Sequence, residues 1–198
     1  GAADEAIILS NGAAQTTAMT ATYEGLEVIN FNAAGTTGLK SASADTSLTL
    51  ASTSLEKVVV TGDAAANLTV SLAGAVLETQ TAEFDASAAG GVITAHVTKG
   101  ASANAAVTMS AQADYLDYNG ALASTITLDG GDGLDYLDLD TNVTYSATAT
   151  AQSASGVSDF EVIRLASGVT VDERSLVNNA GITAVVAFAG GAYTKSTA

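Results

Sequence analysis

A short segment of this chain occurs twice, 21 residues apart. The sequence 114-DYLDYN-119 matches 135-DYLDLD-140 at four of six positions. A looser unit, in which an apolar residue precedes a glutamate and a β-branched run follows, occurs at 25–31, 54–62, 76–84 and 159–168. Units of roughly 20–30 residues that recur along a chain are typical of folds in which structural repeats stack on one another. The repeats therefore favour an elongated, stacked architecture.

The segments around these repeats alternate between apolar and polar residues. Ile93, Ala95 and Val97 share one face of the segment 91–100, and threonines take the other face. The segment 66–74 alternates in the same way. Alternation with a period of two, bounded by Gly, Asn and Asp, predicts short strands joined by tight turns. The chain also contains no proline, which would remove a ladder hydrogen bond from a strand.

These patterns predict an all-β fold, a right-handed parallel β-solenoid (β-helix or β-roll) with short turns and little helix. The repeats favour parallel rungs, whereas alternation alone also fits an antiparallel sandwich. Helical periodicity is confined to 171–181, where we expect one helical turn ending at Gly181. We expect residues 1–198 to form a single elongated domain of a processed chain or of a fragment of a larger protein, with 190–198 as a tail.

The charge balance excludes several functions. The 198 residues include 21 acidic and 6 basic side chains, for a net charge of −15, and no cysteine. Nucleic-acid binding depends on Lys and Arg contacts to phosphate, and anionic lipid also selects basic surfaces. No apolar run approaches the roughly 18 residues that cross a membrane. We therefore expect no nucleic-acid partner, no membrane insertion and no disulfide, and a chain suited to binding cations.

The segment 128-LDGGDGLDYLDLD-140 concentrates five aspartates and three glycines. Calcium prefers about six to eight oxygen ligands from carboxylates and backbone carbonyls. Glycine frees the backbone to aim its carbonyls at an ion. The competing interpretation is that these acids keep a turn solvated or block edge pairing.

One turn supplies only part of a calcium coordination sphere, so a neighbouring rung must complete it. If the 21-residue offset corresponds to one turn of the stack, Asp135 lies on Asp114. The predicted metal ligands are the side chains of Asp114, Asp132 and Asp135 with the carbonyls of Gly130 and Gly133. Asp117, Asp129 and Asp138 are second choices.

Residues 130-GGDGLDYLD-138 fit the nonapeptide G-G-x-G-x-D-x-U-x of repeats-in-toxin (RTX) proteins at every specified position. Together with the segments 47–70, 83–97 and 157–168, they make the chain resemble the calcium-binding bacterial surface-layer (S-layer) proteins over roughly residues 22–168. RTX blocks carry several such nonapeptides in tandem, and this chain has one. We therefore expect one or two calcium ions.

The resemblance implies a secreted structural protein that is exported by a type I system and tiles into a layer or filament on the bacterial cell surface. Its partners would be copies of itself and a cell-surface polysaccharide. The alternative is an RTX-type adhesin or passenger segment that binds a surface ligand. A polysaccharide-acting enzyme would need a carboxylate pair in an aromatic-lined groove, and the chain has no tryptophan and 5% aromatic residues. We therefore expect no enzymatic activity.

Two further sets of residues receive structural interpretations. His96, the one histidine, lies on a threonine-bearing strand face, where we expect a solvent-facing residue and not a metal ligand or general base. Four glutamates follow apolar residues in the looser repeat, and we expect them to stack along an edge of the rungs or to cap it: Glu27, Glu56, Glu78 and Glu161.

Overall fold

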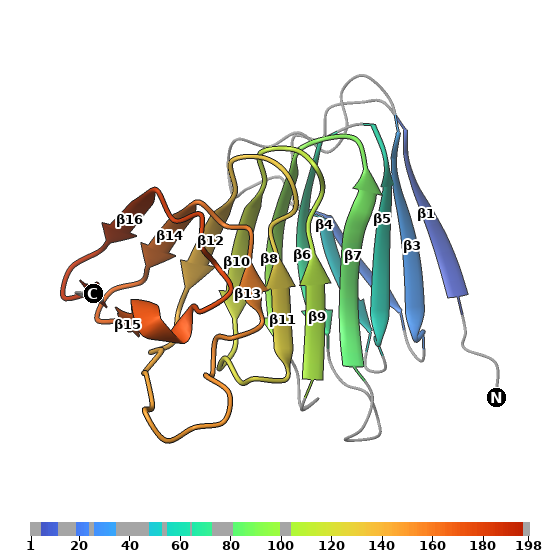
Figure 1. Ribbon diagram of the computed structural model, residues 1–198. Coiled ribbons are helices and arrows are strands. Elements are labelled where there is room, and N and C mark those ends of the chain that lie inside the picture. Colours follow the sequence, from blue (N-terminus) through green and yellow to red (C-terminus); the bar gives the residue numbers. More distant parts are fainter. Residues whose placement is uncertain are drawn as a thin grey trace.

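The computed structural model describes residues 5–11, 19–23, 26–34, 48–52, 55–63, 65–72, 81–99 and 104–195. Over these residues the chain is an all-β solenoid of stacked parallel strands (Figure 1). Sheet A consists of β1 (Glu5–Asn11), β3 (Val28–Ala34), β5 (Lys57–Gly62), β7 (Thr81–Ala89), β9 (Asn104–Thr108), β11 (Ile126–Asp129) and β13 (Val157–Ser158). Sheet B consists of β2 (Met19–Tyr23), β4 (Leu48–Ser52), β6 (Ala66–Leu72), β8 (Ile93–Lys99), β10 (Tyr115–Asn119), β12 (Tyr136–Leu139), β14 (Val162–Leu165) and β16 (Ala184–Ala187). A short sheet C, at the C-terminal end, pairs β15 (Thr170–Asp172) with β17 (Ala192–Thr194).

From β1 to β14 successive strands alternate between sheets A and B, and within each sheet a strand pairs in parallel with the strand two places along the chain. In Figure 1 the strands of sheet A run upward at the front and those of sheet B run downward behind them. The chain meanwhile advances from right to left, so the coil is right-handed. The predicted parallel solenoid is confirmed, and the antiparallel sandwich is excluded.

The core lies between the two sheets and is built from columns of inward side chains. One column of sheet B consists of Leu68, Ala95, Leu116, Leu137 and Ile163, each directly paired with the next and each fully buried. Burying a side chain such as Leu or Ile stabilises the fold by about 1.5–3 kcal/mol. A single rung could not bury its own apolar side chains. Stacking the rungs buries them in one continuous core to which each short strand contributes.

The alternation predicted for individual strands is confirmed. In β8, Ile93, Ala95 and Val97 are buried, whereas Thr98 on the opposite face is exposed. In β6, Leu68, Val70 and Leu72 are buried in the same manner. Because the side-chain period of a strand is two, the buried set and the outward set are fixed by the same register.

The C-terminal region differs from the predicted helical turn and tail. Residues 170–172 form β15, and only Glu173–Ser175 adopt a 3-10 turn, η2. The Asp172 side chain accepts a hydrogen bond from the Arg174 N–H and caps this turn, while β15 is held by pairing with β17. β17 takes Ala192–Thr194 from the segment expected to be a tail, and residues 196–198 lie outside the described residues. No helix in the described part of the chain has the length and apolar character to cross a membrane.

Candidate functional site

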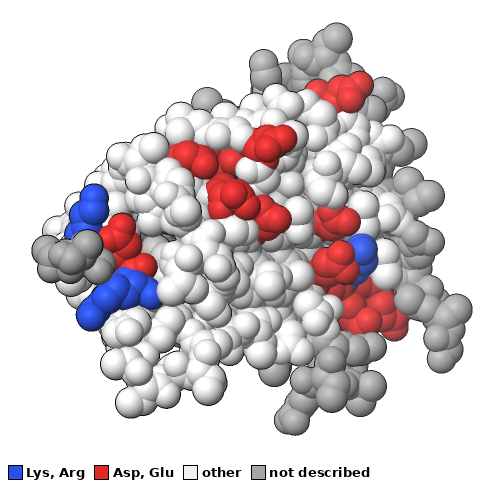
Figure 2. All heavy atoms as spheres, in the orientation of Figure 1, with Lys and Arg blue, Asp and Glu red and all other residues white. Residues whose placement is uncertain are grey.

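The turns from sheet A to sheet B stack on one another along one edge of the solenoid. Residues 109–114 join β9 to β10, and residues 130–135 join β11 to β12. Tyr115 pairs with Tyr136, so Asp114 and Asp135 are neighbours in the stack, and the predicted 21-residue offset is confirmed. Acidic side chains gather over this edge, at the top of Figure 2.

Three carboxylates at the start of successive sheet B strands form a hydrogen-bonded column. Each accepts a backbone N–H from the preceding rung: Asp114 Oδ1 from Ile93 at 2.7 Å, Asp135 Oδ1 from Asp114 at 2.7 Å, and Glu161 Oε2 from Asp135 at 2.8 Å. We call Asp114, Asp135 and Glu161 the carboxylate column. Its side chains satisfy N–H groups where the chain turns and the sheet ladder is interrupted.

Asp114 is a saturated member of this column. Its second oxygen, Oδ2, accepts hydrogen bonds from both the N–H and the Oγ of Ser110, each at 2.7 Å. Burial raises the pKa of the Asp114 carboxyl, and the hydrogen bonds from Ile93 and Ser110 oppose that shift. Because both oxygens are engaged, Asp114 reads as a structural cap of its turn.

Asp135 is buried and incompletely paired. Its side chain is 0% exposed, and Oδ2 has no hydrogen-bond partner. Burial, with a smaller contribution from the charges of Asp114, Glu161 and Asp129, raises the pKa of Asp135 to about 7, and the hydrogen bond from the Asp114 N–H opposes this shift. An unpartnered buried carboxylate oxygen among like charges is unfavourable, and either a proton or a cation relieves it.

The other predicted ligands are placed differently around Asp135. Asp132 is exposed at the tip of the turn. The carboxylates whose charges raise the pKa of Asp135 are those of Asp114, Glu161 and Asp129. Gly130 is buried, and Gly133 is exposed. In the part of the chain that the structure describes, no three acidic or histidine side chains converge as a metal cage. A calcium ion at this turn would need carboxylates from Asp135 and Asp129 and further oxygens from backbone carbonyls and water.

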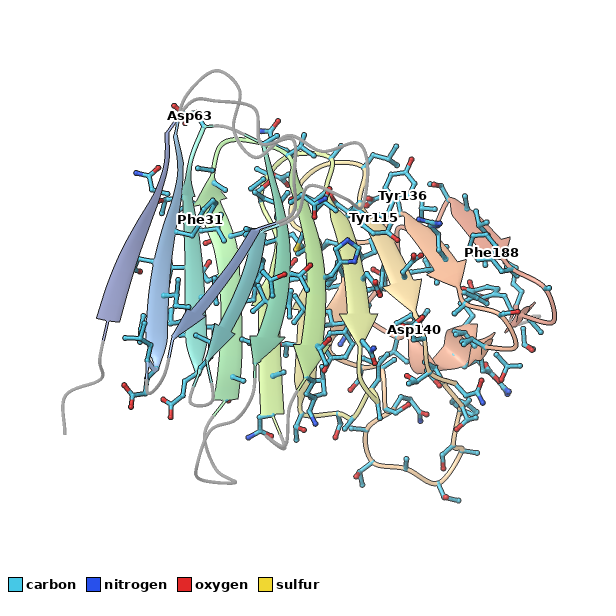
Figure 3. All side chains as sticks on the ribbon, turned by 180° about the vertical axis from the view of Figure 1, so that it is seen from behind. Phe31, Asp63, Tyr115, Tyr136, Asp140 and Phe188 are labelled. Atoms are coloured by element: carbon cyan, nitrogen blue, oxygen red, sulfur yellow. The ribbon has the colours of Figure 1, made fainter. Side chains whose placement is uncertain are left out.

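Asp138 lies on the outer face of sheet B, away from the carboxylate column. Tyr115 donates a hydrogen bond to Asp138, and Arg164 Nε lies 3.3 Å from Asp138 Oδ1. Arg164 also donates to the Tyr115 hydroxyl at 3.0 Å, and its guanidinium lies over the rings of Tyr115 and Phe188. Figure 3 shows Tyr115 and Phe188 on this face. Asp138 therefore already has a cationic partner.

Asp117, the next outward residue along this row, has its own partner. Its Oδ2 lies 2.9 Å from Nδ1 of His96, and both side chains are part-buried on the outer face. His96 is thus an outward-facing strand residue, as predicted, with a neighbouring carboxylate. Asp117 and Asp138 are placed to pair side chains across sheet B and not to complete a site around Asp135.

The Arg164–Asp138 pair gives a first stability prediction. We expect Arg164→Met to destabilise the fold by about 1–3 kcal/mol, because it removes the cation from a carboxylate whose side chain is 21% exposed. Lys57→Met is the matched control, since Lys57 pairs with Glu83 through a single contact and both side chains are more exposed, at 35% and 40%, so it should change stability little. Urea unfolding measures both, and equal losses in the two variants would contradict this account.

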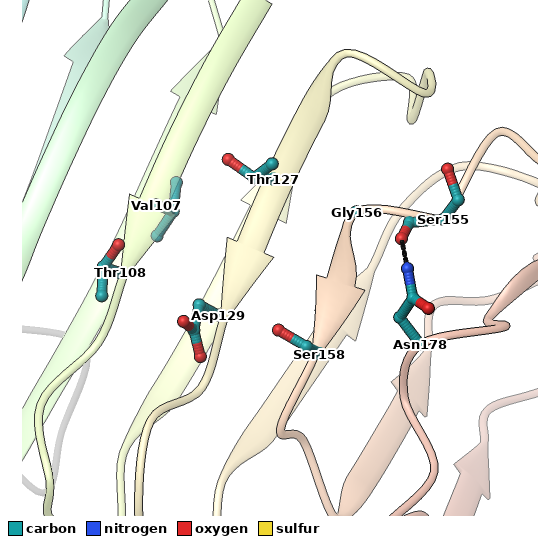
Figure 4. Close-up of a pocket in the computed structure, with 8 residues that line it drawn as sticks. All are labelled: Val107, Thr108, Thr127, Asp129, Ser155, Gly156, Ser158 and Asn178. Carbon is teal, nitrogen blue, oxygen red and sulfur yellow. Dashed lines mark hydrogen bonds between the residues drawn. The ribbon is translucent and has the colours of Figure 1, made fainter. Parts of the chain in front are cut away.

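A shallow hollow of about 280 Å³ lies on the outer face of sheet A (Figure 4). Thr108, Asp129 and Ser158 are paired in register along one side of it. Gly156 also lines the hollow, and the Asn178 amide donates a hydrogen bond to the Ser155 carbonyl. The lining combines hydroxyl, amide and carboxylate groups with apolar surface, which suits a small polar ligand.

No protein-family model matches this chain, and neither the curated proteins nor the solved structures contain a match to it. Its function is therefore inferred from its own residues and their geometry.

Proposed function

We propose that this chain is a secreted structural protein of the bacterial cell surface that self-assembles into a layer or filament and binds calcium in the turn between β11 and β12. The observation that supports this most is the Oδ2 atom of Asp135, which is buried without a partner inside an RTX-like nonapeptide turn. A buried carboxylate oxygen without a partner destabilises a turn that binds no ion, whereas a bound calcium ion would coordinate this oxygen and neutralise its charge.

In this proposal the chain's residues have distinct roles. Asp135 and Asp129 bind the ion, and Asp114 and Glu161 hold the two adjoining rungs through N–H groups. Bound calcium supplies positive charge that offsets the carboxylates of this edge. Because the turn repels itself without the ion, calcium binding and the ordering of the turn are coupled.

Assembly follows from the same electrostatics. A net charge of −15 on 198 residues keeps free subunits apart. Divalent cations lower this repulsion, so contacts between copies become favourable only when calcium is present. No catalytic step belongs to this proposal.

The test is negative-stain electron microscopy of the purified chain, first in chelator and then in millimolar calcium, with calorimetric titration of calcium alongside. We expect calcium to bind at one or two sites and ordered sheets or filaments to appear only with the ion. Isolated rods in both conditions would count against self-assembly, and a flat titration would count against the calcium site.

The hollow on sheet A favours a second candidate, an RTX-type adhesin or passenger segment. Its hydroxyl, amide and carboxylate lining offers hydrogen bonds to a sugar unit of a surface polysaccharide. This candidate predicts a monodisperse monomer in calcium, together with glycan binding that Thr127→Val weakens. Calcium-dependent lattices without glycan binding would favour the structural protein.

A further inference from the structure

The C-terminal end of the solenoid leaves sheet B open. β16 (Ala184–Ala187) is the last strand of that sheet, and β14 is its one neighbour there among the described residues. Ala184 and Phe188 donate their N–H groups toward the β14 side, so by alternation the N–H groups of Val185 and Ala187 point away from it. The strand reads AVVA, with none of the charges, prolines or bulges that protect an edge from pairing.

The core is also uncovered at this end. Ile182, Val185 and Tyr193 pack against the core yet remain only partly buried. They line a hollow of about 170 Å³, at which Glu173 and Lys195 also lie. Val186 and Phe188 beside them are 43% and 48% exposed. An apolar surface of this kind, next to unpaired backbone groups, is suited to receive another strand.

The N-terminal end offers a matching edge. β2 (Met19–Tyr23) is the outermost strand of sheet B at that end, and its register runs unbroken to β16. The strand register sets Met19 in line with Val185 and Thr20 in line with Val186. A β2 strand placed beside β16 in this register sets Met19 against Val185 and Thr20 against Val186.

Charge favours the same pairing. The first 27 residues contain four acidic and no basic residues, whereas residues 160–198 contain three of each. The C-terminal end is therefore neutral, while residues 1–159 carry the whole net charge of −15. Two N-terminal ends repel each other, and an N-terminal end approaching a C-terminal end meets no such repulsion.

We propose that copies of this chain stack head to tail, with β2 of one copy pairing in parallel with β16 of the next. The contact is heterologous and leaves a free edge at each end, so it generates open filaments. This inference rests on the proposed self-assembly and names the surface that carries it.

The chain contains no cysteine, which allows the contact to be trapped between two single-cysteine variants. Val186→Cys mixed with Thr20→Cys is expected to give a disulfide-linked heterodimer under mild oxidation, because directly paired strand residues lie within disulfide range. The control replaces Thr20→Cys with Thr98→Cys, which lies at an exposed position of β8 inside sheet B. Equal crosslinking to both partners, or Val186→Cys homodimers alone, would overturn the head-to-tail contact.

Sedimentation velocity gives an independent measurement. Val185→Lys places a charge on the open end of the core and is expected to weaken association by about tenfold or more, because burying the ammonium is unfavourable. Val92→Lys is the control, since Val92 is 43% exposed in a turn far from both ends. Identical association of the two variants would overturn the proposal, provided that circular dichroism shows both folded.

The two proposals can fail separately. Calcium-dependent lattices without the Thr20–Val186 crosslink would leave the proposed function standing and overturn end stacking. Crosslinked filaments in chelator would support end stacking and overturn the calcium requirement for assembly.

Discussion

Gly130→Ala is expected to destabilise the solenoid by about 3 kcal/mol, because its methyl group has no space between neighbouring rungs. A Cβ at Gly130 would lie 1.9 Å from the Asp159 carbonyl oxygen, and that atom belongs to backbone, which cannot rotate away. The Gly130 N–H donates to Ser158 O at 3.1 Å, so separating the two rungs also breaks a ladder hydrogen bond. Gly130 has no positive φ, and contact alone therefore causes the loss.

Two further glycines separate contact from backbone strain. Gly156, which also has no positive φ, would place a Cβ 2.1 Å from Ile126 O, and we expect Gly156→Ala to behave like Gly130→Ala. Gly168 has a φ of +79° with no neighbour within 4 Å, so Gly168→Ala should cost only about 1 kcal/mol of strain. Urea unfolding in chelator measures all three without any contribution from calcium. A loss at Gly168 as large as that at Gly130 would refute the contact explanation.

The nonapeptide glycines have a second role besides backbone freedom. From the sequence they are explained by backbone freedom around an ion. In the structure Gly130, Gly131 and Gly133 each face a carbonyl of an adjoining rung, from Asp159, Ser110 and Gln112 respectively. The sequence could not show these contacts, because the partners lie about 20 to 30 positions away in turns that share no motif. Gly131 and Gly133 also have φ values of +85° and +135°, so both explanations apply to them.

The sequence predicted best where the rungs keep a constant length. The 21-residue offset placed Asp114 against Asp135, and the structure joins them by the Asp114 N–H. Glu27 and Glu56 stack in register, as expected of an edge, through the pairing of Val28 with Lys57. The prediction for Glu78 lies outside the described residues.

The role of Glu161 beside Asp135 was missed because one rung is longer. The two residues are 26 positions apart, since residues 144–156 make an excursion between Val143 and β13. A signal was present: 161-EVIRL-165 repeats the acid and the apolar third and fifth positions of 135-DYLDL-139. A fixed spacing of 21 residues does not reveal this repeat, because Asp135 and Glu161 are 26 positions apart. Asp132, by contrast, is a predicted ligand because it lies in the turn, and the structure leaves it exposed at the tip of that turn.

Asp135→Asn is expected to stabilise the chain in chelator at pH 8, and to abolish its response to calcium. The asparagine Oδ1 still accepts the Asp114 N–H, and the variant removes a buried charge whose Oδ2 has no partner. We expect a gain on the order of 2 kcal/mol in chelator. Calcium at 100 times its dissociation constant should stabilise the wild type by about 2.7 kcal/mol and the variant hardly at all. Thermal unfolding with and without calcium measures both effects, with the exposed Asp63→Asn as control.

The pH dependence of the same variant distinguishes a buried charge from a merely altered contact. The pKa of Asp135 is raised from 3.8 to about 7 on folding, so the folded chain binds this proton more tightly than the unfolded chain. Protonation of Asp135 makes its full contribution to the free energy of unfolding below about pH 4. This contribution falls as the pH rises toward 7, and above that pH it no longer changes. Asp135→Asn has no such proton, so its advantage in chelator should vanish near pH 4 and reach its full size above pH 7. A variant less stable than the wild type at pH 8 would mean that the Oδ2 atom has a partner in solution, and the principal support for the calcium site would be lost.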